Sequence, residues 1–326
     1  MSQVQPGNRI AVTGATGFVG QILVKHLAVH GYEVVGVSES AKPPPGIADY
    51  LHAYRPADLT RGWPKVRNLA GLVHLAGLAA VGPSFDRPQE YITTNSAMIT
   101  HLFEQALADG WQGRAIVVSS GAVYGGAVDP KGFTEESPLL ATSPYVVSKL
   151  LVERQAEYYR RRGVDALVVR PFNHIGPGQH PGFIVPDLTA KVVAWQPGAE
   201  LPVGNLDSKR DYTDVRDIVS AYQALLELQE PRDATYNVCT GVARSGREIL
   251  EAICAAVGKP VPPTVATDHR AIDPSVITGN ADRLGSETGW EPRIELQTSI
   301  DDFVASTCVN EPPIQQVPQS GESGSR

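Results

Sequence analysis

Cysteine, long apolar runs and basic clusters are all scarce in this chain of 326 residues. The three cysteines, Cys239, Cys254 and Cys308, are widely separated and form no metal-ligand spacing, which predicts thiols in a reducing compartment. No apolar run is long enough to cross a bilayer, and the polar start MSQVQPGN does not have the form of a signal peptide. We therefore expect a cytoplasmic protein with no membrane partner.

The charge balance argues against a nucleic-acid partner. The formal net charge is -7 and no long basic run occurs, although a few local cations could still hold an anionic ligand. A hydrophobic content of 42% and a charged content of 19% suit one large globular unit or two unequal ones. Residues 309–326 are rich in Pro, Gln, Ser and Gly, so we predict a disordered tail.

Strand-like and helical patterns alternate along the first half of the chain. Short apolar runs such as RIAVT, EVVGV, GLVHL, AIVV and ALVVR are separated by helical spacing, for example over residues 90–109 and 145–162. This alternation predicts an α/β fold with a Rossmann-type, doubly wound parallel sheet.

A glycine motif follows the first apolar run and precedes the first helical pattern. Gly14 permits a tight turn, Gly17 lets the backbone approach a pyrophosphate, and Gly20 lets the helix pack against the strand. The helix start then offers free N–H groups to phosphates. The motif predicts a nicotinamide dinucleotide site.

The choice between NADP and NAD stays open. An acid at the end of the second strand usually binds the adenosine ribose, whereas a basic residue accommodates a 2′-phosphate. Ser38 occupies that position, Glu39 follows and Lys42 is close by. Ser38 and Lys42 favour a phosphate, while Glu39 would repel one unless it points to solvent.

A tyrosine and a lysine stand four residues apart at a predicted helix start. Ser143 can cap this helix and Pro144 can be its first residue, so Tyr145 and Lys149 share a face. The ammonium is expected to lower the pKa of the phenol from about 10, which suits proton transfer. Ser120, at a strand end, could hydrogen-bond the same substrate oxygen. A Tyr-x-x-x-Lys pair also arises by chance. Its position after a glycine motif and a strand-end serine is what favours a catalytic role.

The segments TGATGFVG, HLAG, SSGAVYG and YVVSK, in this order, resemble the extended short-chain dehydrogenase/reductases that act on nucleotide sugars. The resemblance runs from about residue 9 to the early three hundreds. It implies that Ser120, Tyr145 and Lys149 are catalytic. It also implies that Asp58 contacts adenine and Asn95 supports the site, although from the residues alone these could equally be a turn residue and a helix-surface amide. The implied cofactor contacts are Gly14, Thr16, Gly17, Phe18, Val19, Ser38, Lys42, Asp58, Leu59, Leu75, Ala76, Tyr145 and Lys149.

The resemblance also implies two domains and a dimer. Residues 8–172, with about 212–240, would bind NAD(P), and residues 173–211 and 241–308 would bind the nucleotide sugar. A homodimer is expected through helices at 86–109 and 144–163.

The stretch RPFNHIGPGQ points to the substrate. Gly-Pro-Gly is a strong breaker, so Asn173 and His174 are predicted where a strand ends and a loop begins, the edge at which parallel sheets bind ligands. The second half most resembles the branch of the family that reduces GDP-4-keto-6-deoxy-D-mannose to GDP-D-rhamnose. Arg210 is predicted in a loop. Arg210 and Arg270 could each bind the diphosphate or could instead be exposed surface residues. The predicted substrate contacts are Asn173, His174, Val203, Arg210 and Arg270.

Two further features bear on function. Gly121 and Ala122 stand where nucleotide-sugar dehydratases carry acids, so dehydration is not expected. Asp214, Arg216 and Asp217 are interpreted as a structural ion network near a helix start. The predicted reaction is NAD(P)H-dependent reduction of a C4 keto group. A 4-epimerase that retains NAD is the alternative, and a non-catalytic dinucleotide sensor is a remote one.

Overall fold

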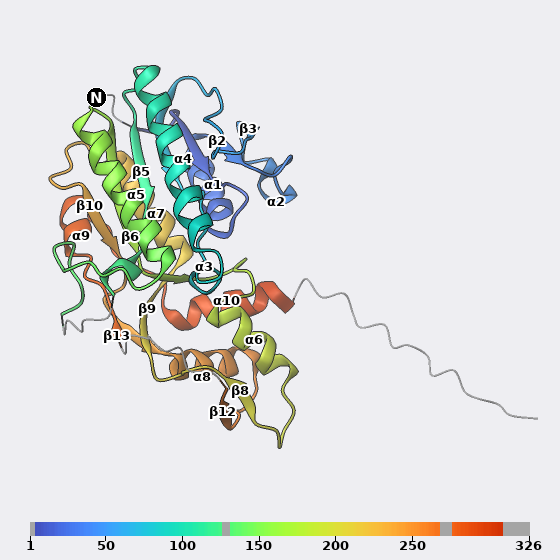
Figure 1. The fold of residues 1–326 in the computed structure, drawn as a ribbon. Coiled ribbons are helices and arrows are strands. Elements are labelled where there is room, and N and C mark those ends of the chain that lie inside the picture. The colour runs from blue at the N-terminus through green and yellow to red at the C-terminus, as the bar shows by residue number, and fades with distance from the viewer. Residues whose placement is uncertain (1–3, 126–130, 268–275, 309–326) are drawn as a thin grey trace, which may run out of the picture.

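The computed structural model describes residues 4–125, 131–267 and 276–308. Its centre is a seven-stranded sheet in the order β10-β6-β5-β4-β1-β2-β3, in which every neighbouring pair is parallel (Figure 1). The strands are β1 (Arg9–Thr13), β2 (Glu33–Ser38), β3 (Ala53–Pro56), β4 (Leu69–His74), β5 (Arg114–Val118), β6 (Asp165–Pro171) and β10 (Thr235–Val238).

Helices cover both faces of the sheet because successive strand side chains point to opposite sides. Ile10 and Val12 face one core cluster with α1 (Phe18–Val29) and α7 (Val215–Glu227), whereas Ala11 faces another with α4 (Pro88–Ala108) and α5 (Pro144–Arg161). The prediction of a doubly wound parallel sheet is confirmed. The switch in strand order lies between β1 and β4, and in such sheets ligands bind beyond the carboxyl ends of the strands.

A smaller lobe lies below the sheet in Figure 1 and has its own apolar core, built from α6 (Ile184–Ala194), α8 (Gly246–Val257) and α10 (Leu296–Cys308). The chain enters this lobe after β6, returns to the large sheet through α7 and β10, and then enters the lobe a second time. The domain boundaries given above remain a prediction. The remaining elements are α2 (Pro45–Ala48), α3 (Val81–Ser84), η1 (Gly121–Tyr124), β7 (Asn173–Ile175), β8 (Leu201–Val203), β9 (Lys209–Asp214), β11 (Ala243–Ser245), β12 (Thr264–Ala266), β13 (Val276–Ile277) and α9 (Asp282–Thr288).

Two segments predicted as loops are strands. Asn173 and His174 lie in β7, which pairs in parallel with Tyr212 and Thr213 of β9. Arg210 also lies in β9, which pairs with β11 and β13 as well. These pairings satisfy backbone groups that a loop would leave to water. The loop begins only at Gly176, whose φ of 137° is strongly positive.

Two predictions fall outside the described residues, namely the substrate contact Arg270 and the disordered tail at 309–326. Within the described ranges, no helix combines the length and the apolar character needed to cross a membrane.

Candidate active site

The glycine motif forms a close-packed turn between β1 and α1. Gly14 has a φ of 65°, and a Cβ atom on it would lie 3.0 Å from the Ala76 backbone nitrogen. A Cβ atom on Gly20 would lie 2.1 Å from the Gly14 carbonyl oxygen, so Gly20 brings the helix against the turn itself. Gly17 is the N-cap of α1 and no side chain caps its first turn. The free N–H groups there suit a phosphate.

A threonine that the sequence reading missed joins this turn to the end of β4. The Thr13 hydroxyl oxygen accepts hydrogen bonds from the backbone nitrogens of Leu75 and Ala76, at 3.0 and 3.1 Å, and lies 2.9 Å from His74 Nδ1. Burial, and secondarily the charge of Lys149, lowers the pKa of His74 to about 3. His74 is therefore neutral at physiological pH. The Thr13 hydrogen bonds hold the ends of β1 and β4 together at one edge of the sheet.

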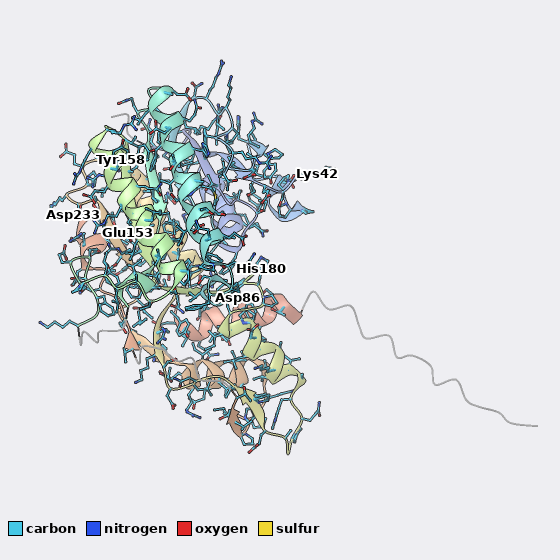
Figure 2. All side chains as sticks on the ribbon, in the orientation of Figure 1. Lys42, Asp86, Glu153, Tyr158, His180 and Asp233 are labelled. Atoms are coloured by element: carbon cyan, nitrogen blue, oxygen red, sulfur yellow. The ribbon has the colours of Figure 1, made fainter. Side chains whose placement is uncertain are left out.

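The expected adenosine end lies at the end of β2. The Ser38 hydroxyl accepts a hydrogen bond from Thr16 N at 3.2 Å and is buried. Glu39 and Lys42 are exposed, and Figure 2 shows Lys42 at the outer side of the sheet. Asp58 accepts hydrogen bonds from the backbone and hydroxyl of Thr60, which lower its pKa, so it is at least a turn residue. This arrangement leaves the choice of NADP or NAD open.

Two of the predicted cofactor contacts at this end have little free surface. Leu59 is 6% exposed and belongs to a small core cluster with Val35, Val37 and Met98. Ala76 packs against the same cluster. Both side chains therefore pack in this cluster, and their contact with the cofactor remains a prediction.

The three predicted catalytic residues come together at the carboxyl edge of β5. Ser143 caps α5 by accepting a hydrogen bond from Val146 N at 3.2 Å, which confirms the predicted helix start. The Ser120 hydroxyl accepts a hydrogen bond from Ala122 N at 3.2 Å, and the same side chain acts to lower the pKa of the buried Tyr145. Lys149 Nζ donates to the Val118 carbonyl at 2.9 Å and lies 5.9 Å from the centre of the Tyr145 ring.

The electrostatics of this cluster correct one expectation. Burial raises the pKa of Tyr145, and the hydrogen bond from Ser120 only partly offsets this effect. Burial also lowers the pKa of Lys149 to about 8, against the attraction of Glu153. The prediction that the ammonium lowers the phenol pKa is wrong for this structure, because Lys149 Nζ is directed at the Val118 carbonyl and desolvation dominates.

Asn95 fixes the loop after β4 to the catalytic helix. Its Oδ1 accepts from Leu78 N at 2.8 Å, and its Nδ2 donates to Ser148 Oγ at 2.9 Å. Asn95 is only 3% exposed, so the alternative of a helix-surface amide is wrong. Ser148 directly precedes Lys149, which makes this amide a support of the site.

The described residues predicted to contact substrate lie in different surroundings. The His174 ring stacks on Phe18 with 6.0 Å between ring centres, which places it beside the glycine turn, and Asn173 next to it is exposed. The Val203 side chain is instead buried in the core of the small lobe, so the prediction that it contacts substrate is wrong for the side chain. Arg210 lies in β9 and donates one hydrogen bond to the Lys209 carbonyl.

The predicted ion network at the start of α7 is confirmed for Asp214 and Arg216. Asp214 caps the helix by accepting from Arg216 N at 2.7 Å, and the Arg216 guanidinium binds both Asp214 and Asp302. Asp217 accepts from the backbone nitrogens of Arg293 and Ile294. These contacts join α7 to residues 293–302 and stabilise the fold.

A separate cavity of about 260 Å³ lies at the opposite edge of the sheet, where β1, β3 and β4 begin. It is apart from the catalytic cluster, which gathers at the carboxyl edge, so it is not the expected cofactor site. Its lining residues are Arg9, Val35, His52, Ala53, Arg55, Lys65, Val66 and Arg67. Among the described residues, no group of three or more His, Cys, Asp or Glu is placed to hold a metal ion.

The fold and the catalytic cluster define a dinucleotide-dependent enzyme class, and comparison with known proteins gives its family. Residues 10–239 match the model of the NAD dependent epimerase/dehydratase family, so the chain belongs to that family.

Three comparisons illustrate what the chain is similar to. The chain is 33% identical to the GDP-6-deoxy-D-mannose reductase of Pseudomonas aeruginosa, over 90% of this chain and 94% of that protein. The structure of RMD from Pseudomonas aeruginosa complexed with NADPH aligns with a TM-score of 0.78 and 31% identity, covering 92% of this chain and 98% of that one. The UDP-glucose 4-epimerase of Thermus thermophilus, complexed with NAD, aligns with a TM-score of 0.80 and 25% identity, covering 93% of this chain and 100% of that one.

Proposed function

We propose that the protein reduces the C4 keto group of a nucleoside-diphosphate 4-keto-6-deoxy sugar, GDP-4-keto-6-deoxy-D-mannose, to GDP-D-rhamnose with NADPH or NADH. The observation that carries the proposal is the cluster of Ser120, Tyr145 and Lys149 beside the glycine turn. The similarity to the Pseudomonas aeruginosa GDP-6-deoxy-D-mannose reductase over 90% of the chain supports the substrate.

The cluster suits acid catalysis. The reduced nicotinamide, when bound, supplies a hydride to C4. Tyr145 then donates its proton to the developing oxyanion, and its raised pKa keeps the phenol protonated at neutral pH. Ser120 hydrogen-bonds the same oxygen and orients the carbonyl. Lys149 would hold the nicotinamide ribose with its ammonium.

The cofactor fits the turn that these residues adjoin. The free N–H groups after Gly17 take the pyrophosphate, and the close approach of Gly14 to Ala76 leaves no side chain in the way. His174, stacked on Phe18, borders the cofactor and the sugar. Asn173 and Arg210 would face the sugar diphosphate, for which an arginine fork is well suited.

The test is a spectrophotometric assay with GDP-4-keto-6-deoxy-D-mannose generated in situ, comparing NADPH with NADH. Stoichiometric loss of reduced cofactor with a GDP-deoxyhexose product is the expected result. Tyr145→Phe removes only one hydroxyl, so it is expected to fold normally and to lose a factor of about 10² to 10⁴ in kcat.

The competing functions give different results in the same experiment. A 4-epimerase would purify with bound NAD, consume no added cofactor and still depend on Tyr145. It is kept as the second candidate because of the alignment with the UDP-glucose 4-epimerase. A dinucleotide sensor would be indifferent to Tyr145→Phe.

The same proposal includes a homodimer built through α4 and α5. Val147, Leu151 and Tyr158 are exposed on α5, at 39%, 36% and 54%, and Figure 2 shows Tyr158 on the outer side of the helix. Leu151→Glu is expected to give a monomer in light scattering, whereas a dimer that survives this change would contradict the interface. The free and buried thiols of Cys239 and Cys254 fit the reducing environment of the cytoplasm, where we place the reaction.

A further inference from the structure

A buried carboxylate lies one helical turn beyond the catalytic lysine. Glu153 follows Lys149 by four residues on α5, so both side chains are on the same face, and each is 8% exposed (Figure 2 labels Glu153). Glu153 Oε1 also accepts a hydrogen bond from Ser119 Oγ at 2.5 Å. Glu153 belongs to the helix that carries Tyr145 and Lys149, and Ser119 directly precedes Ser120. This one carboxylate therefore ties the catalytic helix to the segment that follows β5.

An arginine from the substrate side completes this contact. Arg170, near the end of β6, binds Glu153 through two hydrogen bonds, from Nε at 2.9 Å and from a terminal nitrogen at 2.7 Å. The other terminal nitrogen donates to Tyr124 OH at 2.9 Å and to the Glu135 carbonyl at 3.2 Å. Arg170 stands three residues before Asn173, so the ion pair joins the catalytic helix to the strand that leads into the predicted substrate segment.

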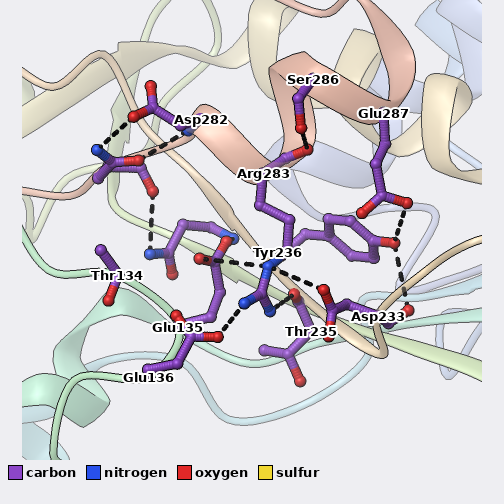
Figure 3. Close-up of polar contacts among 12 residues, drawn as sticks. Thr134, Glu135, Glu136, Asp233, Thr235, Tyr236, Asp282, Arg283, Ser286 and Glu287 are labelled. Atoms are coloured by element: carbon purple, nitrogen blue, oxygen red, sulfur yellow. Dashed lines mark hydrogen bonds and ion pairs between the residues drawn. The ribbon is translucent and has the colours of Figure 1, made fainter.

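The network continues to β10, the edge strand beside β6. Tyr124 OH donates to Asn237 Oδ1 at 2.6 Å, and Asn237 N donates to the Glu135 carboxylate at 2.7 Å. Figure 3 shows how Arg283 of α9 reaches Glu135, Glu136 and Asp233 from there. The Glu153–Arg170 pair is therefore the central link between the site and a rigid support.

We propose that Glu153 and Arg170 are positioning residues of the active site, which hold Ser120, Lys149 and the Asn173 segment in register. This inference rests on the proposed function for its kinetic readout. It assigns neither residue a contact with substrate or cofactor.

The charges around Lys149 give the direction of the effect. His74 of β4 is neutral because burial lowers its pKa to about 3, and Tyr145 on α5 is a neutral phenol because burial raises its pKa. Of the described groups that act on the pKa of Lys149, Glu153 is the one that raises it, against the larger effect of burial. Removing the Glu153 charge removes this attraction, which pushes the pKa of Lys149 further below about 8.

The experiment compares the wild type with Glu153→Gln and with Glu153→Gln/Arg170→Gln. Each protein is measured for kcat against pH from 6 to 10, for the Kd of NADPH and NADH by fluorescence over the same range, and for its melting temperature. Asp165→Asn is the matched control, because it breaks another largely buried ion pair, Arg114–Asp165 at 2.9 Å, at the opposite edge of the sheet.

In both Glu153 variants we expect the alkaline loss of kcat, and the alkaline rise in Kd, to begin about one pH unit earlier than in the wild type, which is about a tenfold loss of kcat on the alkaline side. The double variant removes the unpaired buried cation, so its melting temperature is expected to recover towards that of the wild type while its pH profile stays shifted. The Asp165→Asn control is expected to melt earlier with an unshifted profile.

A purely structural pair would give another pattern. If the double variant regained both its stability and the wild-type pH profile, or if Asp165→Asn shifted the profile as much, the positioning role would be refuted. Should Glu153→Gln fail to fold, the double variant alone decides. The two hypotheses can fail separately: a shifted Kd profile without turnover of the keto sugar would reject the proposed substrate and keep this inference.

Discussion

Adding one methyl group at Gly20 should disturb both the fold and the cofactor site. A Cβ atom there would lie 2.1 Å from the Gly14 carbonyl oxygen and 2.9 Å from Ala15 Cα. Carbon and oxygen atoms in ordinary contact are more than 3 Å apart, so the turn and α1 must separate by about 1 Å. Overpacking of this kind costs about 1–3 kcal/mol, and the buried, backbone-lined position of Gly20 favours the upper end.

The assay for Gly20→Ala combines thermal unfolding with cofactor titration. A loss of about 3 kcal/mol corresponds to a fall of roughly 4 °C in the melting temperature of a chain of this size. The first turn of α1 moves away from Gly14, so we expect the Kd of the dinucleotide to rise about tenfold or more, since tenfold corresponds to about 1.4 kcal/mol.

Two other glycines provide controls for this prediction. A Cβ atom on Gly17 would lie 3.3 Å from the Gly14 carbonyl, so Gly17→Ala should melt close to the wild type and lose cofactor affinity only. Nothing lies within 4 Å of a Cβ atom on Gly82, so Gly82→Ala should change neither quantity. If Gly20→Ala kept the wild-type melting temperature and Kd, the reasoning from this close contact would be refuted.

Two more predictions concern the catalytic cluster. Burial lowers the pKa of Lys149 from 10.5 to about 8, which corresponds to a cost of roughly 3 kcal/mol at pH 7 that fades as the pH rises from 8 towards 10.5. Lys149→Met should therefore be inactive but about 1–3 kcal/mol more stable than the wild type in urea at pH 7, with a smaller difference at pH 9.5; a less stable variant at pH 7 would contradict the buried charge. Gly121→Asp should lose about 1–3 kcal/mol in the same assay, because a Cβ atom there would lie 2.8 Å from the Phe172 ring, and it should form no dehydrated product. A stable Gly121→Asp protein that expels the C6 hydroxyl would show that the site tolerates a dehydratase acid.

The parts of the fold that the sequence predicted depend on neighbouring residues. The turn at Gly14 and the start of α5 at Ser143 and Pro144 are set within a few residues, so spacing alone located them. The strands around Asn173 and Arg210 were predicted as loops because their pairing partners lie far along the chain. A breaker such as Gly176 marks where a strand must end, but it does not say where the next one begins.

The parts of the candidate site that the sequence did not predict depend on packing. The position of Glu153 four residues after Lys149 is a signal that could have found it, because an acid on the buried face of a helix needs a partner. That the partner is Arg170 follows only from the packing of β6 against α5. The direction of the Tyr145 pKa was predicted wrongly for the same reason, since the extent of burial is not visible in a helical spacing.

The protonation of Tyr145 bears on the choice between reductase and epimerase. An epimerase must first take a proton from a sugar hydroxyl, and this requires a phenolate. In this structure burial raises the pKa of Tyr145, and Lys149, whose Nζ donates to the Val118 carbonyl, does not offset the burial. A reduced nicotinamide ring is uncharged and leaves that balance unchanged, whereas an oxidised ring carries a positive charge that would favour the phenolate. The raised pKa of Tyr145 in the free protein is thus consistent with the proton donation that the proposed reduction requires.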